Sequence, residues 1–331
     1  MKRNQRFDFR SRALIFFELV LSFALVACST GPQSPPAQNT STSDTSVQIF
    51  ATTGYLADAA KNIAPNANVR TLVGPGGDPH TYQPSTRDIQ ALIDADLVLW
   101  NGLHLEAQML ELLEGLGEKQ LGVGELLDPD KLIAWTSPQG GAEALHDPHI
   151  WNSPELWRQV VLEIAKKLGE RDPDRAKEYL ENAAHYNQQI LEAENWARDR
   201  LAKIPDSGRI LITGHDAFNY FGQTFNLEIY ATDFISTDAL LSPTRLSELA
   251  TLIAQRQVPV IFRDNQANPQ AIQSLKEAVQ AESWTVKISE EELYADTLGV
   301  SDPGAAHDVG TYIGALKHNV EAVANALGVM K

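Results

Sequence analysis

The sequence predicts an α/β protein in which two lobes, each built on a parallel sheet, are bridged by one long rigid helix. Strand patterns alternate with helix patterns over residues 47–168 and again over residues 209–327, an order typical of parallel sheets. Between these regions, residues 172–203 contain no glycine and place apolar side chains at steps of three and four, as one helix does. We therefore expect an N-terminal lobe at 47–171, a bridging helix at 172–205 and a C-terminal lobe at 206–331.

Asp172 is expected to cap the bridging helix, with Pro173 at its first position and Pro205 just behind its end. At a rise of 1.5 Å per residue, such a helix extends roughly 45 Å, more than a surface helix of one lobe needs. The length therefore predicts a helix that contacts both lobes. Its apolar positions are Ala176, Tyr179, Leu180, Ala183, Tyr186, Ile190, Ala193, Ala197 and Leu201.

The two lobes are expected to repeat the same alternation of elements. In the N-terminal lobe the predicted strands are 47–51, 69–73, 97–100 and 133–135, and the predicted helices are 54–63, 85–94, 105–116 and 155–168. In the C-terminal lobe the predicted strands are 209–213, 227–231, 258–263 and 285–288, and the predicted helices include 244–255, 269–279 and 309–327. Ligands of such sheets bind at the carboxyl ends of the strands, so the loops there are the places to look for a site.

Residues 1–27 have the pattern of a signal peptide, with a basic start and an apolar run at 13–27 that is short for a transmembrane span. The run ends in Leu25-Val26-Ala27-Cys28, which resembles a bacterial lipobox and implies cleavage before Cys28 and a lipid on its sulfur. Glu18 departs from the pattern because a carboxylate is costly to insert, and an ordinary signal peptide is the alternative. Residues 28–46 are polar and aperiodic, so we expect a disordered tether that holds the body on the extracytoplasmic side of the membrane.

The cysteine count and the charge exclude several classes of function. Cys28 is the only cysteine, so the body after it has neither internal disulfides nor thiolate metal ligands. Without residues 1–27 the chain keeps 22 basic and 41 acidic residues, a net charge of −19, and we expect no nucleic-acid partner. The chain has no His-Glu-x-x-His segment, no glycine-rich phosphate loop and no Gly-x-Ser-x-Gly segment, so it predicts no hydrolase or nucleotide site.

Histidines in loops after predicted strands are the candidates for chemistry. His80 and His149 each end an Asp-Pro-His tripeptide, in which proline restricts the backbone before the imidazole. The loop around His80 contains three prolines and three glycines, and we expect it to be rigid but not packed. His215 directly follows a strand and is expected to open a helix that Asp216 caps. Asp296 lies in a polar turn between the last strand and the last helix, where by itself it would be an ordinary turn aspartate.

The other five histidines have simpler explanations. His185 and His318 fall on predicted helices, where we expect them to be packed or solvated. His104 precedes a helix, and His146 and His307 lie in loops. A secondary role stays open for His104 and His146, but none of the five is predicted to be a principal metal ligand.

Five segments of the chain resemble the zinc and manganese solute-binding lipoproteins of ABC importers. The similarity runs in order from about Val47, includes the lipobox, and implies that the chain is a receptor and not an enzyme. It also implies two α/β lobes bridged by a rigid helix, a membrane permease as partner, and a monomer. The segments are Gly-Gly-Asp-Pro-His-Thr-Tyr-Gln-Pro-Ser (76–85), Asp-Pro-His-Ile-Trp (147–151), Gly-His-Asp-Ala-Phe-Asn-Tyr-Phe (214–221), Tyr-Ala-Asp-Thr-Leu-Gly (294–299) and Gly-Thr-Tyr-Ile-Gly-Ala-Leu-Lys-His-Asn (310–319).

Carried over from the resemblance, the metal ligands are His80 and His149 from the first lobe and His215 and Asp296 from the second. Three imidazoles and one carboxylate suit Zn2+ in a near-tetrahedral site, whereas Mn2+ prefers more oxygen ligands. Family members that resemble manganese importers more often have glutamate at the third position, which here is His215. Members dedicated to zinc often carry a histidine-rich acidic loop, which residues 139–144 and the single His146 do not provide. We predict Zn2+, with Mn2+ or Fe2+ as the alternative.

Two other functions are compatible with a bound zinc ion. A surface adhesin would leave no residue signature, and a zinc enzyme would need an open coordination position for water. The fourth protein ligand argues against the enzyme. Because imidazole binds metal only when neutral and titrates near ~6.5, we expect the metal affinity to fall steeply below about pH 6.

Overall fold

The computed structural model describes residues 46–135, 145–232 and 242–328. The predicted signal peptide, Cys28 and almost all of the tether lie outside these ranges, as do residues 139–144. In the ranges that are described, none of the helices is both long enough and apolar enough to cross a membrane.

The N-terminal lobe is built on a parallel sheet in the order β2 (Asn68–Thr71), β1 (Gln48–Ala51), β3 (Leu97–Trp100) and β4 (Gln120–Gly122). All four residues of β3 are buried, as a central parallel strand requires. Helix α1 (Gly54–Ile63) begins where the Thr53 side chain accepts the backbone N–H of Leu56. Helix α2 (Thr86–Asp94) begins with a reciprocal capping box between Ser85 and Asp88. The parallel sheet is therefore present as predicted, with β4 as an additional edge strand.

The helix predicted at 105–116 is wrong in extent. A 3-10 turn (Ala107–Met109) leads into a single short helix, α3 (Leu110–Glu114). Three consecutive residues before it have positive φ, namely Gly102, Leu103 and His104, a conformation that is incompatible with a helix start. The buried Glu106 carboxylate stabilises this loop because it accepts the Thr52 hydroxyl and the backbone N–H groups of Asn101 and Gly102.

The strand predicted at 133–135 lies outside the parallel sheet. It forms β5 (Ala134–Trp135), which pairs antiparallel with β6 (Leu145–His146). The partner strand β6 was not predicted, because two residues are too few to show an apolar alternation. The pair places His146 directly before the Asp-Pro-His segment at 147–149.

The C-terminal lobe contains two parallel strand pairs. Strand β7 (Ile210–Thr213) pairs with β8 (Glu228–Ala231), and β9 (Val260–Asp264) pairs with β10 (Lys287–Leu293). Strands β7 and β9 are neighbours, so the four strands follow the order β8, β7, β9, β10. Helices α6 (Asn219–Phe225), α7 (Pro243–Gln255), α8 (Pro269–Ala281) and α9 (Tyr312–Leu327) complete the lobe.

Two boundaries of the C-terminal lobe differ from the predictions. Strand β10 continues to Leu293 beyond the predicted end at 288, with a register shift between Ile288 and Glu292. Its middle residues are exposed glutamates, which carry no apolar pattern. Helix α9 begins at Tyr312 and not at 309, because the Thr311 side chain caps it by accepting the backbone N–H of Gly314.

The predicted bridging helix is shorter than expected and begins later. Helix α4 (Pro154–Arg171) is followed by a 3-10 turn (Pro173–Arg175), and α5 runs from Ala176 to Leu201, 26 residues or about 39 Å. The Asp172 side chain does not cap it. Its carboxylate accepts the Arg175 Nε–H and the Tyr179 hydroxyl. Leu180, predicted to be on the apolar face, is 43% exposed.

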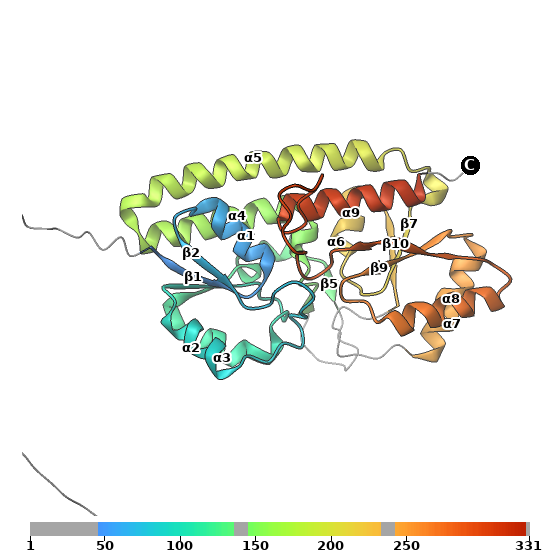
Figure 1. Ribbon diagram of the computed structural model, residues 1–331, viewed down its shortest axis with the longest axis horizontal. Helices are drawn as coiled ribbons and strands as arrows, with labels where there is room; N and C mark the ends of the chain where they lie inside the picture. The colour runs from blue at the N-terminus through green and yellow to red at the C-terminus, as the bar shows by residue number, and fades with distance from the viewer. Residues whose placement is uncertain (1–45, 136–144, 233–241, 329–331) are drawn as a thin grey trace, which may run out of the picture. The chain divides into compact units, whose positions relative to one another are not determined.

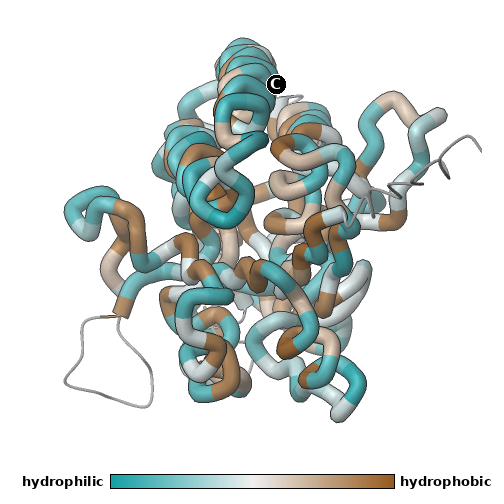
Figure 2. Tube along the Cα trace, turned by 90° about the vertical axis from the view of Figure 1, so that its left-hand side faces the viewer, coloured by the Kyte–Doolittle hydropathy of each residue, from teal (hydrophilic) through white to brown (hydrophobic). Residues whose placement is uncertain are grey.

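Helix α5 packs against both lobes, which is the role predicted for it. Tyr179, Ala183, Tyr186 and Ile190 belong to the core that contains α1, α4 and the N-terminal sheet, whereas Ala193, Ala197 and Leu201 belong to a core that contains β9 and α9. Figure 1 shows α5 extending over α4 at one end and over α9 at the other. In Figure 2, where α5 is again at the top, most of its residues are hydrophilic, as befits a helix with one buried face. The α/β architecture with two parallel-sheet regions and one long helix is thus confirmed.

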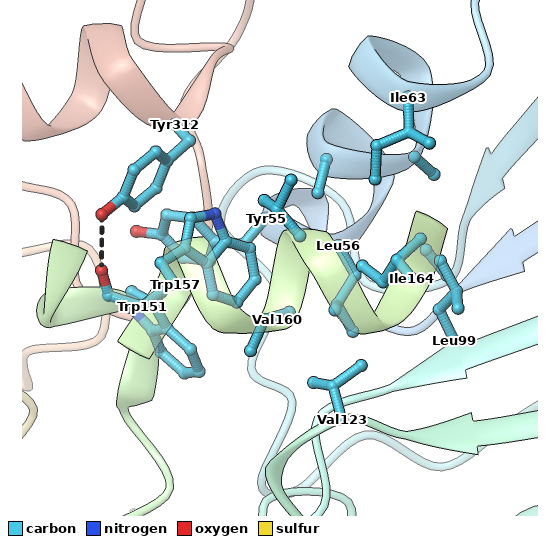
Figure 3. Packing of buried hydrophobic residues seen from close by; sticks show 14 of the residues in the cluster. Tyr55, Leu56, Ile63, Leu99, Val123, Trp151, Trp157, Val160, Ile164 and Tyr312 are labelled. Atoms are coloured by element: carbon cyan, nitrogen blue, oxygen red, sulfur yellow. Dashed lines mark hydrogen bonds between the residues drawn. The ribbon is translucent and has the colours of Figure 1, made fainter. Parts of the chain in front are cut away.

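Aromatic side chains fill the region where α1, α4 and α9 meet (Figure 3). Tyr55 of α1 stacks on Trp151 with 5.0 Å between the ring centroids, and Trp157 of α4 packs against Tyr312 of α9. The Tyr312 hydroxyl donates to the Trp151 carbonyl oxygen. All four side chains are almost fully buried. Because Trp151 follows His149 by two residues, this aromatic cluster supports the segment that carries His149.

Candidate metal-binding site

The structure brings together the four residues that the sequence singled out. His80 lies in the loop after β2, His149 follows β6, His215 follows β7, and Asp296 follows β10. One ligand atom from each side chain lies within 4.8 Å of the others, and all four side chains are buried. Among the described residues this is the one group of three or more histidine, cysteine or acidic side chains that could hold an ion.

The ligand atoms lie at the spacing of a tetrahedron. The Nε2 atom of His149 is 3.3 Å from that of His80 and 3.1 Å from that of His215. Oxygens of Asp296 lie 3.4 Å from the Nε2 atoms of His80 and His149, and 3.2 Å from that of His215. A tetrahedron with ligands 2.0–2.1 Å from its centre, as for zinc, has edges of roughly 3.3 Å. With Asp296 Oδ2 as the fourth ligand atom, four of the six edges lie between 3.1 and 3.4 Å, near the length for zinc, while the contact with His149 comes from the other oxygen, Oδ1.

His149 is held through both its backbone and its ring. The Oδ1 atom of the buried Asp147 accepts the His149 backbone N–H at 3.0 Å and lies 2.7 Å from the ring Nδ1. The indole of Trp151 packs edge-to-face against the ring at 5.3 Å between centroids. With Nδ1 on the carboxylate, Nε2 is free to bind a metal. In the Asp-Pro-His segment at 147–149, proline was expected to set the geometry of the histidine, but Asp147 is the residue that orients the His149 ring.

His215 is held mainly through its backbone. The Oδ2 atom of Asp264, at the end of β9, accepts the backbone N–H groups of Gly214 and His215 at 2.8 and 3.0 Å. The Nδ1 atom of the ring is buried and has no hydrogen-bond partner in the described part of the chain. The predicted helix start at His215 is wrong, because α6 begins at Asn219 and Asp216 does not cap it. The Asp216 carboxylate instead accepts from the Asn219 side chain.

The expectation of an unpacked His80 loop is wrong at Pro79 and His80, which are buried, although much of the loop around them is exposed. His80 is 4% exposed, and its backbone N–H donates to the Asp78 carboxylate at 2.9 Å. Two hydrogen bonds connect the loop to the C-terminal lobe, from Gln266 Nε2 to the Gly77 carbonyl oxygen at 2.7 Å and from the Gly76 N–H to the Thr297 hydroxyl at 3.4 Å. Gly76 has a φ of +76°, which explains the need for glycine there. These contacts bring a ligand of the N-terminal lobe to those of the C-terminal lobe.

Asp296 is positioned by hydrogen bonds to the residue before it. The Ala295 carbonyl oxygen accepts the Trp151 indole N–H at 2.8 Å and the Tyr55 hydroxyl at 3.0 Å, and its N–H donates to the Asn265 side chain at 2.8 Å. Within the described residues, only the three imidazoles approach the Asp296 carboxylate oxygens, which are otherwise unpartnered and fully buried. A buried carboxylate in this position favours a bound cation.

The electrostatics of the site also favour a cation. Burial opposes ionisation of Asp296, but the charges of His215 and His149 and hydrogen bonds from His215 and His80 hold its pKa well below the usual value. Burial likewise lowers the pKa of His215, yet Asp296, Asp264 and Asp216 together raise it to about 10. Burial lowers the pKa of His80, which keeps that ring neutral and able to bind metal. The acidic groups around His215 therefore favour a positive charge beside Asp296, as a proton on His215 or as a metal ion.

The remaining histidines lie elsewhere. His185 faces Gln189 on α5, His318 of α9 contacts the Glu292 carbonyl oxygen, and His307 packs against Trp196. His104 is an exposed residue with positive φ, and His146 belongs to β6. None of these five belongs to the cluster around Asp296.

Comparisons with known proteins agree with this geometry. The family described as zinc-uptake complex component A, periplasmic, matches residues 49–326. The chain is 34% identical over 312 residues to the manganese-binding lipoprotein MntA of Bacillus subtilis, which covers 93% of this chain and 97% of MntA. It is 34% identical over 282 residues to the zinc-binding protein TroA of Treponema pallidum, covering 84% of this chain and 88% of TroA.

The solved structure of the periplasmic zinc-binding protein TroA from Treponema pallidum has a TM-score of 0.78 with this chain, covering 85% of this chain and 99% of TroA. A more distant relative is the metal ABC transporter substrate-binding lipoprotein ScbA of Streptococcus cristatus, 26% identical over 320 residues, or 93% of this chain and 96% of ScbA. The names of the relatives carry different metals, manganese for MntA and zinc for TroA.

Proposed function

We propose a cargo and a ligand set for this chain. The chain belongs to the periplasmic zinc-uptake component A family. Members of this family are metal-binding substrate receptors of ABC importers and not enzymes. The cargo is Zn2+, and the ligands are His80, His149, His215 and Asp296. The receptor captures the ion between its lobes and delivers it to a membrane permease. Cys28 carries the lipid anchor, which the lipobox and the names of lipoprotein relatives support.

The observation that carries the choice of zinc is the donor set, three imidazole nitrogens and one carboxylate brought together at one buried place. Imidazole is a preferred ligand of zinc, whereas manganese prefers carboxylate, carbonyl and water oxygens. The distances of 3.1 to 3.4 Å between the ligand atoms are compatible with neighbouring ligands of a zinc ion.

No bond is made or broken in this function. Three neutral imidazoles and one carboxylate replace the water around the ion, and binding displaces the proton that His215 shares with Asp296. Since two ligands come from each lobe, the bound ion cross-links the lobes and fixes one arrangement of them. A permease can then distinguish the loaded receptor from the empty one.

Thermal unfolding of single variants, with and without zinc, tests the ligand set. At a hundredfold excess of zinc over its dissociation constant, binding adds roughly 2.7 kcal/mol to the free energy of unfolding, or about 4 °C in melting temperature for a body of this size. Alanine in place of His80, His149 or His215 should remove most of that shift. Alanine in place of Asp296 should remove less, because water can take the position of the carboxylate. The matched controls, which should keep the shift, are alanine variants of His104, His146, His185, His307 and His318.

A full zinc-dependent shift in His215→Ala would contradict a site shared by both lobes. Affinity in vitro does not identify the natural cargo, because zinc binds most nitrogen and oxygen sites more tightly than manganese does. The cargo is identified instead by elemental analysis of the protein isolated from its own host under zinc limitation. Manganese or iron in that protein would contradict the assignment of zinc.

A further inference from the structure

The side chain of Asn219 lies between the segments that carry His149 and His215. Asn219 is the first residue of α6, in the C-terminal lobe. Its Nδ2 atom is 3.0 Å from Asp147 Oδ2, in the N-terminal lobe, and 3.0 Å from Asp216 Oδ1, next to His215. One amide group therefore donates to a carboxylate on each side of the site.

The chemistry of the amide fits this position. An asparagine Nδ2 carries two hydrogens, which is one for each of the two carboxylates. Without that donor, two negative groups would face each other in a place with little water, where their repulsion is strong. In agreement with their proximity, burial and the Asp147 carboxylate both raise the pKa of Asp216. Asn219 belongs to the segment 214–221, and nothing in the sequence pattern assigns it a role there.

Asp147 connects Asn219 to the metal site, because its carboxylate contacts both Asn219 and His149. While Oδ2 of Asp147 accepts from Asn219, Oδ1 accepts the backbone N–H of His149 and lies 2.7 Å from its Nδ1. The orientation of the His149 ring thus depends on the position of a carboxylate that Asn219 holds. The Nε2 atoms of His149 and His215 are 3.1 Å apart.

We propose that Asn219 is a positioning residue that holds the segments of His149 and His215 together and thereby favours zinc, which depends on imidazole ligands more than manganese does. This inference rests on the proposed function of the site. Loss of the amide removes the link between Asp147 and Asp216, so the two histidine-bearing segments separate and the His149 ring loses its orientation. A misplaced imidazole weakens zinc binding more than manganese binding, because manganese prefers oxygen ligands.

The test uses the full body of the protein, residues 28–331, and the variant Asn219→Leu, which keeps the size of the side chain and removes the donor. The matched control is Asn182→Leu, because the Asn182 amide also makes one hydrogen bond between elements, to the Ile63 carbonyl oxygen, but far from the site. Asn219→Ala serves as a second variant in case leucine disturbs folding. Cobalt(II) is the spectroscopic probe, since its visible absorption distinguishes tetrahedral from six-coordinate geometry.

In Asn219→Leu we expect a roughly 10–100-fold loss of zinc affinity, a smaller loss of manganese affinity, and a cobalt spectrum shifted away from the tetrahedral form. Asn182→Leu should match the wild type in all three. A double variant, Asn219→Leu with Asp147→Asn, should bind zinc no more weakly than Asp147→Asn alone, because Asn219 acts through Asp147.

Unchanged zinc affinity and cobalt spectrum in both Asn219 variants would overturn the proposal, as would fully additive losses in the double variant. Failure of the proposed function is a separate result, because in that case the wild-type protein itself would bind neither zinc nor cobalt at this site.

Discussion

His149 and His215 contribute Nε2 atoms that lie 3.1 Å apart, yet the protein holds the two rings in different ways. Asp147 contacts both the backbone N–H and the ring Nδ1 of His149. Asp264 contacts only the backbone N–H of His215, whose Nδ1 has no partner among the described residues. The same type of ligand is therefore fixed by its ring in one loop and by its main chain in the other.

Because the two rings are held differently, His149 and His215 have different roles when the ion binds. The ring of His149 is oriented before the ion arrives, so it can bind without further ordering. The ring of His215 is placed by its loop and faces Asp296, with which it shares a proton in the ion-free protein. The His149 ring is thus oriented before zinc binds, whereas His215 must release a proton when zinc binds.

The largest expected effect comes from removing the carboxylate that orients the ring. Asp147→Asn should lower zinc affinity roughly 10–100-fold, because the anion at His149 Nδ1 is lost while the shape is kept. Asp264→Asn should cost less affinity, since the asparagine oxygen can still accept a backbone N–H of the His215 loop. Competition titration against a chelator at constant pH measures both. Equal losses, or a larger loss in Asp264→Asn, would show that the ring contact is not the important difference.

The pH dependence of zinc affinity should reveal the proton on His215. Because the pKa of His215 is raised to about 10 in the ion-free protein, zinc must displace one proton at neutral pH, and the affinity should rise about tenfold per pH unit from pH 7 to 9. Below about pH 6 the slope should become steeper as the other imidazoles take up protons. This extends the sequence-based expectation, which placed the whole decline below about pH 6. A flat affinity from pH 7 to 9 would exclude the shared proton.

His215 should also make the stability of the zinc-free protein fall as the pH rises, whereas zinc affinity rises with pH. A histidine whose pKa is higher in the folded than in the unfolded state stabilises the fold fully below about pH 6.5 and loses that contribution as the pH rises through about 10. The zinc-loaded protein carries no such proton, so its melting temperature should decline less over this range. Parallel thermal melts of the two forms from pH 6.5 to 9.5 measure the difference.

The sequence patterns and the resemblance predict the α/β architecture and the four residues that the structure brings together. Whether these four bind the metal stays a prediction. The resemblance to a known family supplied the four residues. His80, His215 and Asp296 follow strands with parallel partners, where ligands of such sheets bind, whereas His149 follows the antiparallel strand β6. The hydrogen bonds that Asn219 and Asp264 make near the ligands were not predicted, because the residues they join are distant in the chain. Asn219 and Asp147 are 72 positions apart, and Asp264 and His215 are 49 apart.

The boundary errors have local physical causes. The cap expected at Asp172 failed because its carboxylate binds Arg175 and Tyr179 side chains, which compete with backbone N–H groups. The start of α6 was misplaced because His215 is in a loop whose backbone donates to Asp264 on another strand. Patterns along the chain describe the burial of a segment but not the hydrogen bonds that reach it from elsewhere.

The smallest expected effect on the site is that of Tyr220→Phe, which tests whether the carboxylate or the main chain of Asp147 matters for the ring. The buried Tyr220 hydroxyl donates to the Asp147 carbonyl oxygen at 3.0 Å and accepts the Ile133 N–H at 3.1 Å. Its loss leaves two backbone groups without their partner, so the free energy of unfolding should fall by about 1–3 kcal/mol. The carboxylate of Asp147 keeps its bonds to His149 and Asn219, so zinc affinity at neutral pH should change by less than about threefold, under ~0.7 kcal/mol. Denaturant unfolding and chelator competition on the same sample separate the two quantities. A tenfold loss of affinity would mean that the main chain of Asp147, and not only its carboxylate, sets the position of His149.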